Sequence, residues 1–296
     1  MSEEEHVLYF GYGSNLDTKD WMQWCEQRGA DPSGRTELEP CWLPDHRLMF
    51  HYHSRSRGGG AADVTPAGCG HTVPGVLFSL NANALANMDR KEGHPTVYRR
   101  TMVNVVKADG SSVEAMTYRV TQEKISDYVP PTSSYVDLIK RNLLRHKLPI
   151  EDLKNAIEDS DSSYPVRRLF VYGTLMKGQS RHSTITHHIA NQGIKASTKG
   201  ALYNLGDYPG MRCSDSGTVH GELYEMDEVF LTLQSLDRVE GFYGFQSPNS
   251  LFRRTLILVE VNCEMVWAWS YFYAQEPELS DRIESGDWRI WNSSVF

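Results

Sequence analysis

Two short segments of this chain share one pattern, in which an apolar strand ends in Tyr-Gly, a small hydroxyl residue and a turn. "YFGYGSNL" occupies Tyr9–Leu16, and "LFVYGTLM" occupies Leu169–Met176. They lie about half of the 296-residue chain apart. An internal repeat at this distance predicts a tandem duplication, and therefore two similar domains.

The same series of elements follows each turn. A strand with Gly near its start comes next, then a short helical stretch, then an alternating strand that begins with an aromatic residue and two arginines, and finally another aromatic strand. The period-two alternation predicts half-buried strands. The matching ranges are 74–80 and 220–226, 81–93 and 227–241, 97–106 and 251–261, and 114–120 and 266–274.

A polar, acidic stretch, "EDSDSSYPV" at Glu158–Val166, separates the two copies and is typical of an exposed linker. We therefore expect one domain over residues 1–160 and a second over residues 161–296. Before the linker, apolar spacing predicts a helix from about Tyr135 to Ile157 that breaks near Pro149. The second copy has no equivalent helical tail.

Composition narrows the class of protein. The formal net charge is −8 and no basic run occurs, which argues against nucleic acid as the partner. No apolar stretch is long enough to span a membrane. The acidic start does not resemble a signal peptide. The five scattered cysteines are typical of reduced thiols, not of a disulfide framework or a zinc site, so a cytoplasmic protein is expected.

The turns suggest an anion-binding site. Gly13 and Gly173 allow close approach of another group to the backbone, and successive backbone N–H groups at such a bend form a nest for a carboxylate or an oxyanion. Taken alone, one such turn is better interpreted as a tight connection between a strand and a helix with no ligand.

An acidic residue recurs at the same place in both copies. Glu92 lies in "MDRKEG" and Glu240 in "LDRVEG", each expected at the end of a helix with Gly as its C-terminal cap. A glutamate beside an oxyanion nest can act as a general base and then as a general acid, and burial in an aromatic pocket would raise its pKa. Residues expected to line such pockets are Tyr98, Tyr118 and Tyr135 in the first copy and Phe252, Tyr271 and Tyr273 in the second.

Taken together, these motifs resemble the gamma-glutamylcyclotransferases. "YGSNL", "DRKEG" and "PPTSSY" make the first half similar to the gamma-glutamyl cyclotransferase branch, and "VYGTLMKGQSRH", "LDRVEG", "LFRRT" and "SGDWR" make the second similar to the gamma-glutamylamine cyclotransferase and AIG2-like branch. The resemblance implies an α+β fold of two tandem small mixed β-barrels with flanking helices.

The resemblance also implies roles for individual residues. Glu92 and Glu240 would be the catalytic acid/base groups, and the turn amides would hold a gamma-glutamyl group that cyclises to 5-oxoproline without metal or cofactor. The second half departs at Phe252, where the first has Tyr98. The expected substrate-binding residues are Tyr12, Gly13, Ser14, Asn15, Leu16, Tyr98, Tyr118 and Tyr135, and in the second half Tyr172, Gly173, Thr174, Leu175 and Tyr273.

Several alternatives remain open from the sequence. One or both halves could bind a gamma-glutamyl-like molecule without turnover. A serine hydrolase using Ser14 is disfavoured, because no G-x-S-x-G elbow is present and the second copy has Thr174. His51 and His53, with His46 nearby, could hold a metal but lack a ligand-spaced partner. The sequence does not determine the leaving group, because a dipeptide, a glutathione fragment, a gamma-glutamylamine, an isopeptide and an antibiotic intermediate share the reacting end. It does not determine the oligomeric state either.

Overall fold

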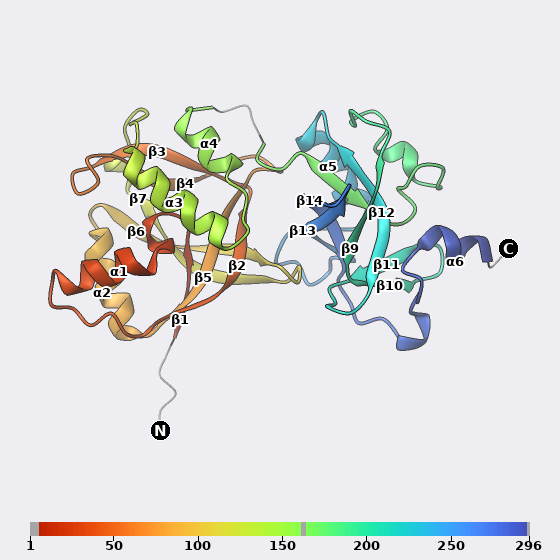
Figure 1. Cartoon of the computed structure of the whole chain (residues 1–296), viewed down its shortest axis with the longest axis horizontal. Helices are drawn as coiled ribbons and strands as arrows, with labels where there is room; N and C mark the ends of the chain where they lie inside the picture. The colour runs from red at the N-terminus through yellow and green to blue at the C-terminus, as the bar shows by residue number, and fades with distance from the viewer. Residues whose placement is uncertain (1–5, 161–163, 295–296) are drawn as a thin grey trace, which may run out of the picture. The chain divides into compact units, whose positions relative to one another are not determined.

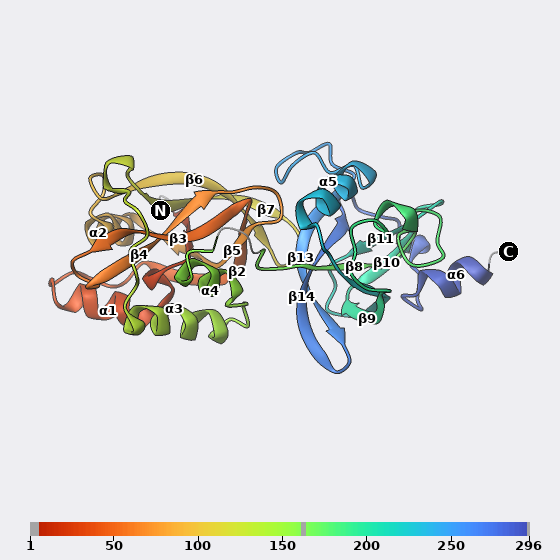
Figure 2. The same ribbon diagram turned by 90° about the horizontal axis from the view of Figure 1, so that it is seen from above.

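The computed structural model describes residues 6–160 and 164–294. The chain divides into two compact units, one of residues 1–107 and 113–165 and the other of residues 108–112 and 166–296 (Figures 1 and 2). Each unit is an α+β structure built on a closed barrel of strands.

In the first unit the barrel has the strand order β1-β5-β2-β6-β7. β1 runs antiparallel to β5 and parallel to β7, where Tyr9 pairs with Met116 and closes the barrel. The barrel is therefore mixed, as expected. Its strands are β1 (Val7–Gly11), β2 (Arg35–Pro44), β5 (Thr72–Leu80), β6 (Tyr98–Lys107) and β7 (Ser112–Val120).

Further elements of the first unit lie on the outside of its barrel (Figure 1). The hairpin of β3 (His46–Ser54) and β4 (Gly59–Pro66) forms a separate two-stranded sheet between β2 and β5 in the chain. The helices are α1 (Thr18–Glu26), α2 (Ala82–Glu92), α3 (Ser133–Arg145) and α4 (Glu151–Ile157), with short 3₁₀ turns η1 (Ser14–Leu16) and η2 (Gln122–Lys124). The predicted helical stretch is divided into α3 and α4, and Pro149 lies between them. The predicted break is therefore confirmed.

In the second unit the barrel order is β12-β8-β14-β13-β9, the same cyclic order as in the first unit. The parallel pair is again the one between the first and last strands, with Trp269 opposite Leu169. Its strands are β8 (Arg168–Val171), β9 (Ile194–Lys199), β12 (Thr218–Glu225), β13 (Phe252–Val261) and β14 (Glu264–Tyr273), and its hairpin is β10 (Ala201–Asn204) with β11 (Pro209–Arg212). The helical elements are η3 (His182–Thr184), α5 (Val229–Val239), η4 (Leu279–Asp281) and α6 (Trp288–Ser294).

The repeat is visible at the level of single contacts. The Tyr12 hydroxyl donates to the Tyr118 carbonyl oxygen over 2.6 Å, and the Tyr172 hydroxyl donates to the Tyr271 carbonyl oxygen over 2.7 Å. Each bond ties the turn after the first strand to the last strand. Tyr12 and Tyr172 therefore occupy equivalent positions, and the prediction of two similar barrels is confirmed.

A glycine is required for steric reasons at one position of β5 and at the equivalent position of β12. A Cβ on Gly75 would lie 2.4 Å from the Gly11 carbonyl oxygen, and one on Gly221 would lie 2.2 Å from the Val171 carbonyl oxygen. Both distances are far below van der Waals contact. A side chain at either position would push its strand away from the neighbouring strand that leads into the Tyr-Gly turn.

The two recurring glutamates lie at the ends of equivalent helices. Glu92 is the last residue of α2, and Gly93 caps that helix in the left-handed conformation at φ 65°. Glu240 follows α5 directly, and Gly241 has φ 59°. The Gly after each glutamate thus ends its helix in the left-handed conformation, as predicted from the sequence.

The "SGDWR" segment supports the turn of the second unit. Arg289 donates to the Lys177 carbonyl oxygen and to Glu222 Oε1, at 2.7 and 2.8 Å. Glu222 in turn accepts from the Lys177 backbone N–H over 2.7 Å. This network holds the chain just after Tyr172-Gly173.

α3 is the longest helix in the described part of the chain, with 13 residues, and none of the described helices combines the length and apolar character that a bilayer crossing requires.

Candidate active site

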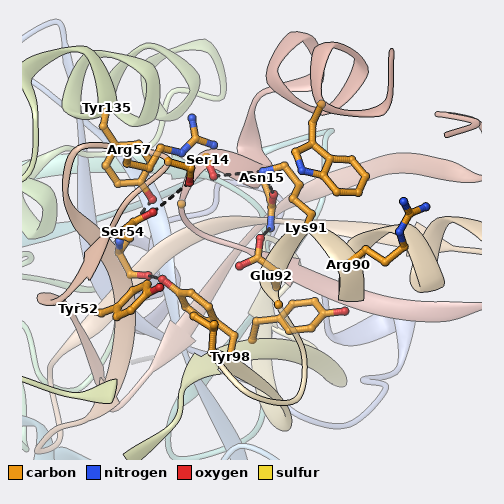
Figure 3. A pocket seen from close by; sticks show the side chains of 18 of the residues that line it. Ser14, Asn15, Tyr52, Ser54, Arg57, Arg90, Lys91, Glu92, Tyr98 and Tyr135 are labelled. Carbon is orange, nitrogen blue, oxygen red and sulfur yellow. Dashed lines mark hydrogen bonds between the residues drawn. The ribbon is translucent and has the colours of Figure 1, made fainter. Parts of the chain in front are cut away.

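A cavity of about 240 Å³ opens at the end of the first barrel where the Tyr-Gly turn, the end of α2, the β3–β4 hairpin and the start of α3 meet (Figure 3). Glu92 lies near its centre in Figure 3, with Tyr135 and Arg57 toward one end and Arg90 toward the other. The predicted residues Tyr12, Gly13, Ser14, Asn15, Glu92, Tyr98, Tyr118 and Tyr135 all line it.

Asn15 orients Glu92. Its Nδ2 donates to Glu92 Oε1 over 2.9 Å and to the Tyr9 hydroxyl over 2.7 Å. Its Oδ1 accepts from Lys91 Nζ over 2.9 Å. Asn15 is itself buried, so its amide direction is determined by these three contacts. One carboxylate oxygen of Glu92 is held in this way on the wall of the cavity.

A second group of charges lies behind that wall. Arg57 donates to both carboxylate oxygens of Asp20 at 2.8 and 2.9 Å, and Lys91 Nζ lies 3.1 Å from Asp20 Oδ2. The guanidinium of Arg57 also lies over the Tyr135 ring, 5.2 Å from its centroid. Asp20 therefore neutralises Arg57 and Lys91 in part and fixes both beside the cavity.

The tyrosine hydroxyls are engaged with the protein. Tyr98 donates to the Ala62 carbonyl oxygen over 3.0 Å, and Tyr135 accepts from the Ala62 backbone N–H over 3.3 Å. Tyr118 donates to Asp89 Oδ1 over 2.7 Å. Burial raises the pKa of Tyr98 and of Tyr135 above the usual value. These rings therefore stay neutral near pH 7 and form a rigid, partly apolar wall.

The turn itself is a 3₁₀ helix. The Leu16 N–H donates to the Gly13 carbonyl oxygen over 3.1 Å, and the N–H groups of Ser14 and Asn15 stand at the helix start, where no intrahelical acceptor exists. Leu16 is fully buried and its N–H is used within the turn, so it does not line the cavity. A Cβ on Gly13 would lie 3.2 Å from the Tyr135 hydroxyl, which explains the small residue there.

The second unit has a much smaller cavity at the equivalent place, about 30 Å³. Tyr172, Gly173, Thr174, Leu175 and Glu240 all line it. Enclosure raises the pKa of Glu240 to about 7, and Asp237 adds to the shift while Arg181 opposes it. A carboxyl group with such a pKa exchanges a proton near neutrality, which suits acid/base catalysis.

Aromatic residues differ between the two cavities. Phe252 lines the second cavity where Tyr98 lines the first, and Tyr271 donates to Asp237 Oδ1 over 2.7 Å, as Tyr118 does to Asp89. Tyr273 does not line the cavity. Its ring packs on Phe252 with centroids 5.6 Å apart, and Tyr271, two residues earlier on the same strand, lines the cavity instead.

The sequence reasoning missed several residues of the first site. Lys91 had a local signal, because it directly precedes Glu92 at the end of the helix. Asp20 and Arg57 come from α1 and from the β3–β4 turn and had none. In the second site Arg181 and Tyr208 were missed, and the Arg181 guanidinium lies 5.5 Å from the Tyr208 ring centroid.

The histidines of "HYH" do not form a metal centre in the structure. His51 Nε2 lies 2.7 Å from Asp63 Oδ2 across the β3–β4 hairpin, and both residues are buried. Within residues 6–160 and 164–294 no group of three potential ligands comes together. Ser14 lies beside Lys91 and Tyr135, not beside a histidine, so the serine-hydrolase geometry is not present there.

Comparison with known proteins agrees with this geometry. The model of the family "Gamma-glutamyl cyclotransferase, AIG2-like" matches residues 9–137 and again residues 169–290. The chain belongs to this family. The two matches cover both Tyr-Gly turns, Glu92 and Glu240.

Individual relatives match one half of the chain's length. The Escherichia coli gamma-glutamylcyclotransferase family protein YtfP is 34% identical over 124 residues, 41% of this chain and 95% of its own. The gamma-L-glutamyl-butirosin B gamma-glutamyl cyclotransferase of Niallia circulans is 33% identical over 122 residues, 41% of this chain and 74% of its own. A solved gamma-glutamyl cyclotransferase structure is 25% identical, covers 54% of this chain and 90% of its own, and has a TM-score of 0.44.

Proposed function

We propose that the protein is a gamma-glutamylcyclotransferase that releases 5-oxoproline and an amine or amino acid from a gamma-glutamyl compound. Family membership supports this class of activity. The observation that carries the proposal is Glu92, held by Asn15 on the wall of a 240 Å³ cavity beside the open N–H groups of the Tyr-Gly turn. A general base and an oxyanion nest are the two groups that the cyclisation requires.

The reaction needs positioning more than activation by a cofactor. The alpha-amine attacks the gamma-carbonyl carbon of the same molecule, a C–N bond forms, and the bond to the leaving nitrogen breaks. Because the attack is intramolecular, folding the gamma-glutamyl chain into a near-attack pose supplies much of the rate increase. The tyrosine wall of Tyr98, Tyr118 and Tyr135 gives the cavity a fixed shape for that pose.

Glu92 transfers the proton. It accepts a proton from the ammonium of the substrate so that the free amine can attack, and it returns the proton to the departing nitrogen. The N–H groups of Ser14 and Asn15 stabilise the tetrahedral oxyanion. Lys91, 2.9 Å from Asn15 Oδ1, polarises the amide that holds Glu92.

The second unit carries the same groups in a smaller space. Its cavity of about 30 Å³ has room for about two or three water molecules, because a water needs at least about 10–15 Å³ on this measure. A gamma-glutamyl group enters only if Arg181 or Tyr208 moves aside. We therefore propose that the first half carries most of the turnover, and that the second half handles other leaving groups, such as amines, or binds a gamma-glutamyl-like molecule without turnover.

The test is release of 5-oxoproline, detected by mass, from a panel of gamma-glutamyl amino acids and gamma-glutamyl amines. Glu92→Gln and Glu240→Gln keep the side-chain shape but cannot accept a proton, so each variant reports the other site. We expect Glu92→Gln to lower turnover of the best substrate at least about 100-fold, the lower range of what a positioned general base contributes.

Two results would contradict this proposal. One is a double variant that still forms 5-oxoproline at the wild-type rate, which would exclude both glutamates as the base. The other is equal turnover by the two single variants across the panel, which would exclude a division of labour between the halves.

A further inference from the structure

The first cavity holds a pair of arginines that the cyclisation does not use. Among the described residues, the cations that line it are Arg28, Arg57, Arg90 and Lys91. Arg57 and Lys91 contact Asp20, as described above. Arg28 and Arg90, by contrast, have no carboxylate within ion-pair distance in the described part of the chain. The cavity therefore presents two positive charges that are not neutralised by the protein.

Trp24 holds the guanidinium groups of Arg28 and Arg90, of which Arg90 also donates to Asn87 Oδ1 over 3.5 Å, in one place. The Arg28 guanidinium lies 4.8 Å from the centroid of the Trp24 ring, and that of Arg90 lies 6.0 Å from it. Cation–π contacts of this kind restrict a flexible arginine while leaving its N–H donors available. Trp24 itself stacks on buried Trp21, with ring centroids 6.0 Å apart, so the platform is anchored in the core.

The position of Arg28 and Arg90 relative to Glu92 indicates which part of a bound substrate the two arginines would contact. In Figure 3, Arg90 lies at one end of the cavity, with Glu92 between it and the Tyr135 end. Arg90 and Glu92 also belong to the same helix end, two residues apart. A substrate whose scissile bond lies at Glu92 and whose gamma-glutamyl end lies toward the turn and Tyr135 therefore places its leaving group near Arg28 and Arg90.

We propose that Trp24, Arg28 and Arg90 form a subsite for a carboxylate on the leaving group of the substrate. This inference rests on the proposed function, and it names the substrate class as gamma-glutamyl amino acids or peptides whose leaving portion carries a negative charge. Guanidinium groups bind carboxylates through charge-assisted hydrogen bonds of defined geometry. An uncharged amine would leave both arginines without a carboxylate partner.

The second unit supports the assignment by contrast. Trp24 and Arg28 belong to α1 and the residues after it, which have no helical counterpart in the second unit, where turns and η3 follow Tyr172-Gly173. The smaller cavity is lined by one arginine, Arg181, which lies near enough to Glu240 to lower its pKa. The second site thus lacks an arginine pair of this kind, and it does not favour an anionic leaving group.

The experiment compares two substrates that differ in one group, gamma-glutamyl-alanine and gamma-glutamyl-alaninamide. The full chain is used with Glu240→Gln, so that the first site alone is measured. In the double variant Arg28→Gln/Arg90→Gln we expect KM for gamma-glutamyl-alanine to rise about tenfold, with kcat unchanged and with the alaninamide unaffected. Arg99→Gln is the matched control, because Arg99 is exposed on β6 and does not line the cavity.

A second readout needs no variant. The interaction between partly exposed charges is screened by salt, so KM for gamma-glutamyl-alanine should rise with NaCl more steeply than KM for the alaninamide, which keeps only the charges of the gamma-glutamyl end. A KM ratio between the two substrates that is the same in the wild-type and doubly substituted chains would overturn the proposal. So would an equal salt response of the two substrates.

A binding measurement tests the proposed subsite independently of the proposed cyclisation activity. Titration calorimetry on the Glu92→Gln/Glu240→Gln chain, in which both candidate bases are removed, measures affinity for both compounds without turnover. Tighter binding of gamma-glutamyl-alanine than of the alaninamide, lost with Arg28→Gln/Arg90→Gln, supports the subsite even if no gamma-glutamyl compound is turned over by the wild-type chain. Equal affinities for the two compounds would overturn the subsite while leaving cyclisation intact.

Discussion

Removal of the Asn15 amide tests whether orientation of Glu92 matters for the reaction. In Asn15→Ala the hydrogen bond to Glu92 Oε1, the bond to the Tyr9 hydroxyl and the bond from Lys91 are all lost. A hydrogen bond to a charged group contributes about 1.5–3 kcal/mol. If that energy is lost from the transition state, the rate falls about 10- to 150-fold, since about 1.4 kcal/mol corresponds to a factor of ten.

The assay is 5-oxoproline release from the full chain with Glu240→Gln, so that the first site alone is measured. We expect the loss in kcat, because Glu92 becomes free to rotate away from the reacting nitrogen, while KM changes by less. The thermal unfolding midpoint of each variant is measured beside the rate.

Tyr9→Phe is the matched control for this variant. It removes the hydroxyl that accepts from Asn15 over 2.7 Å but leaves the bond between Asn15 and Glu92 in place. A neutral hydrogen bond contributes about 1 kcal/mol, so the rate should fall about fivefold or less. If Asn15→Ala slowed the reaction no more than Tyr9→Phe did, the argument that Asn15 orients the base would be refuted.

Two further predictions concern buried carboxyl groups. Because enclosure raises the pKa of Glu240 to about 7, any turnover that survives in Glu92→Gln should increase with pH through about 7, as the base loses its proton; a rate independent of pH from 5.5 to 8.5 would count against Glu240 as the base. Burial raises the pKa of Asp152 to about 8 from an ordinary value of 3.8, so the folded state holds this proton more tightly than the unfolded state does, and stability is lost as pH rises from about 4 to about 8. Asp152→Asn should remove that loss, by on the order of a few kcal/mol at pH 8, and its denaturation midpoint should vary less between pH 5 and pH 8 than that of the wild-type chain; an unchanged difference would contradict the reasoning.

The sequence by itself determined the repeat and the order of elements within it. Strand alternation, the Gly that precedes a strand and the Gly that ends a helix are local properties, because they depend on the steric demands of a few neighbouring residues. Gly75 and Gly93 are examples, one required by the close backbone of Gly11 and the other by its left-handed conformation. The turn tyrosines and the two glutamates follow from the same local patterns, so both candidate sites could be located without coordinates.

The tertiary structure decided which side chains actually meet at each site. Asp20, Arg57 and Lys91 are distant in sequence, and their contacts depend on how α1, α2 and the β3–β4 hairpin pack. Tyr271 and Tyr273 lie two residues apart on one strand and face the same side of it, so the position of the cavity along the strand decides that Tyr271 lines it. The difference between about 240 Å³ and about 30 Å³ has the same origin, since a cavity is the space left after every surrounding side chain has packed.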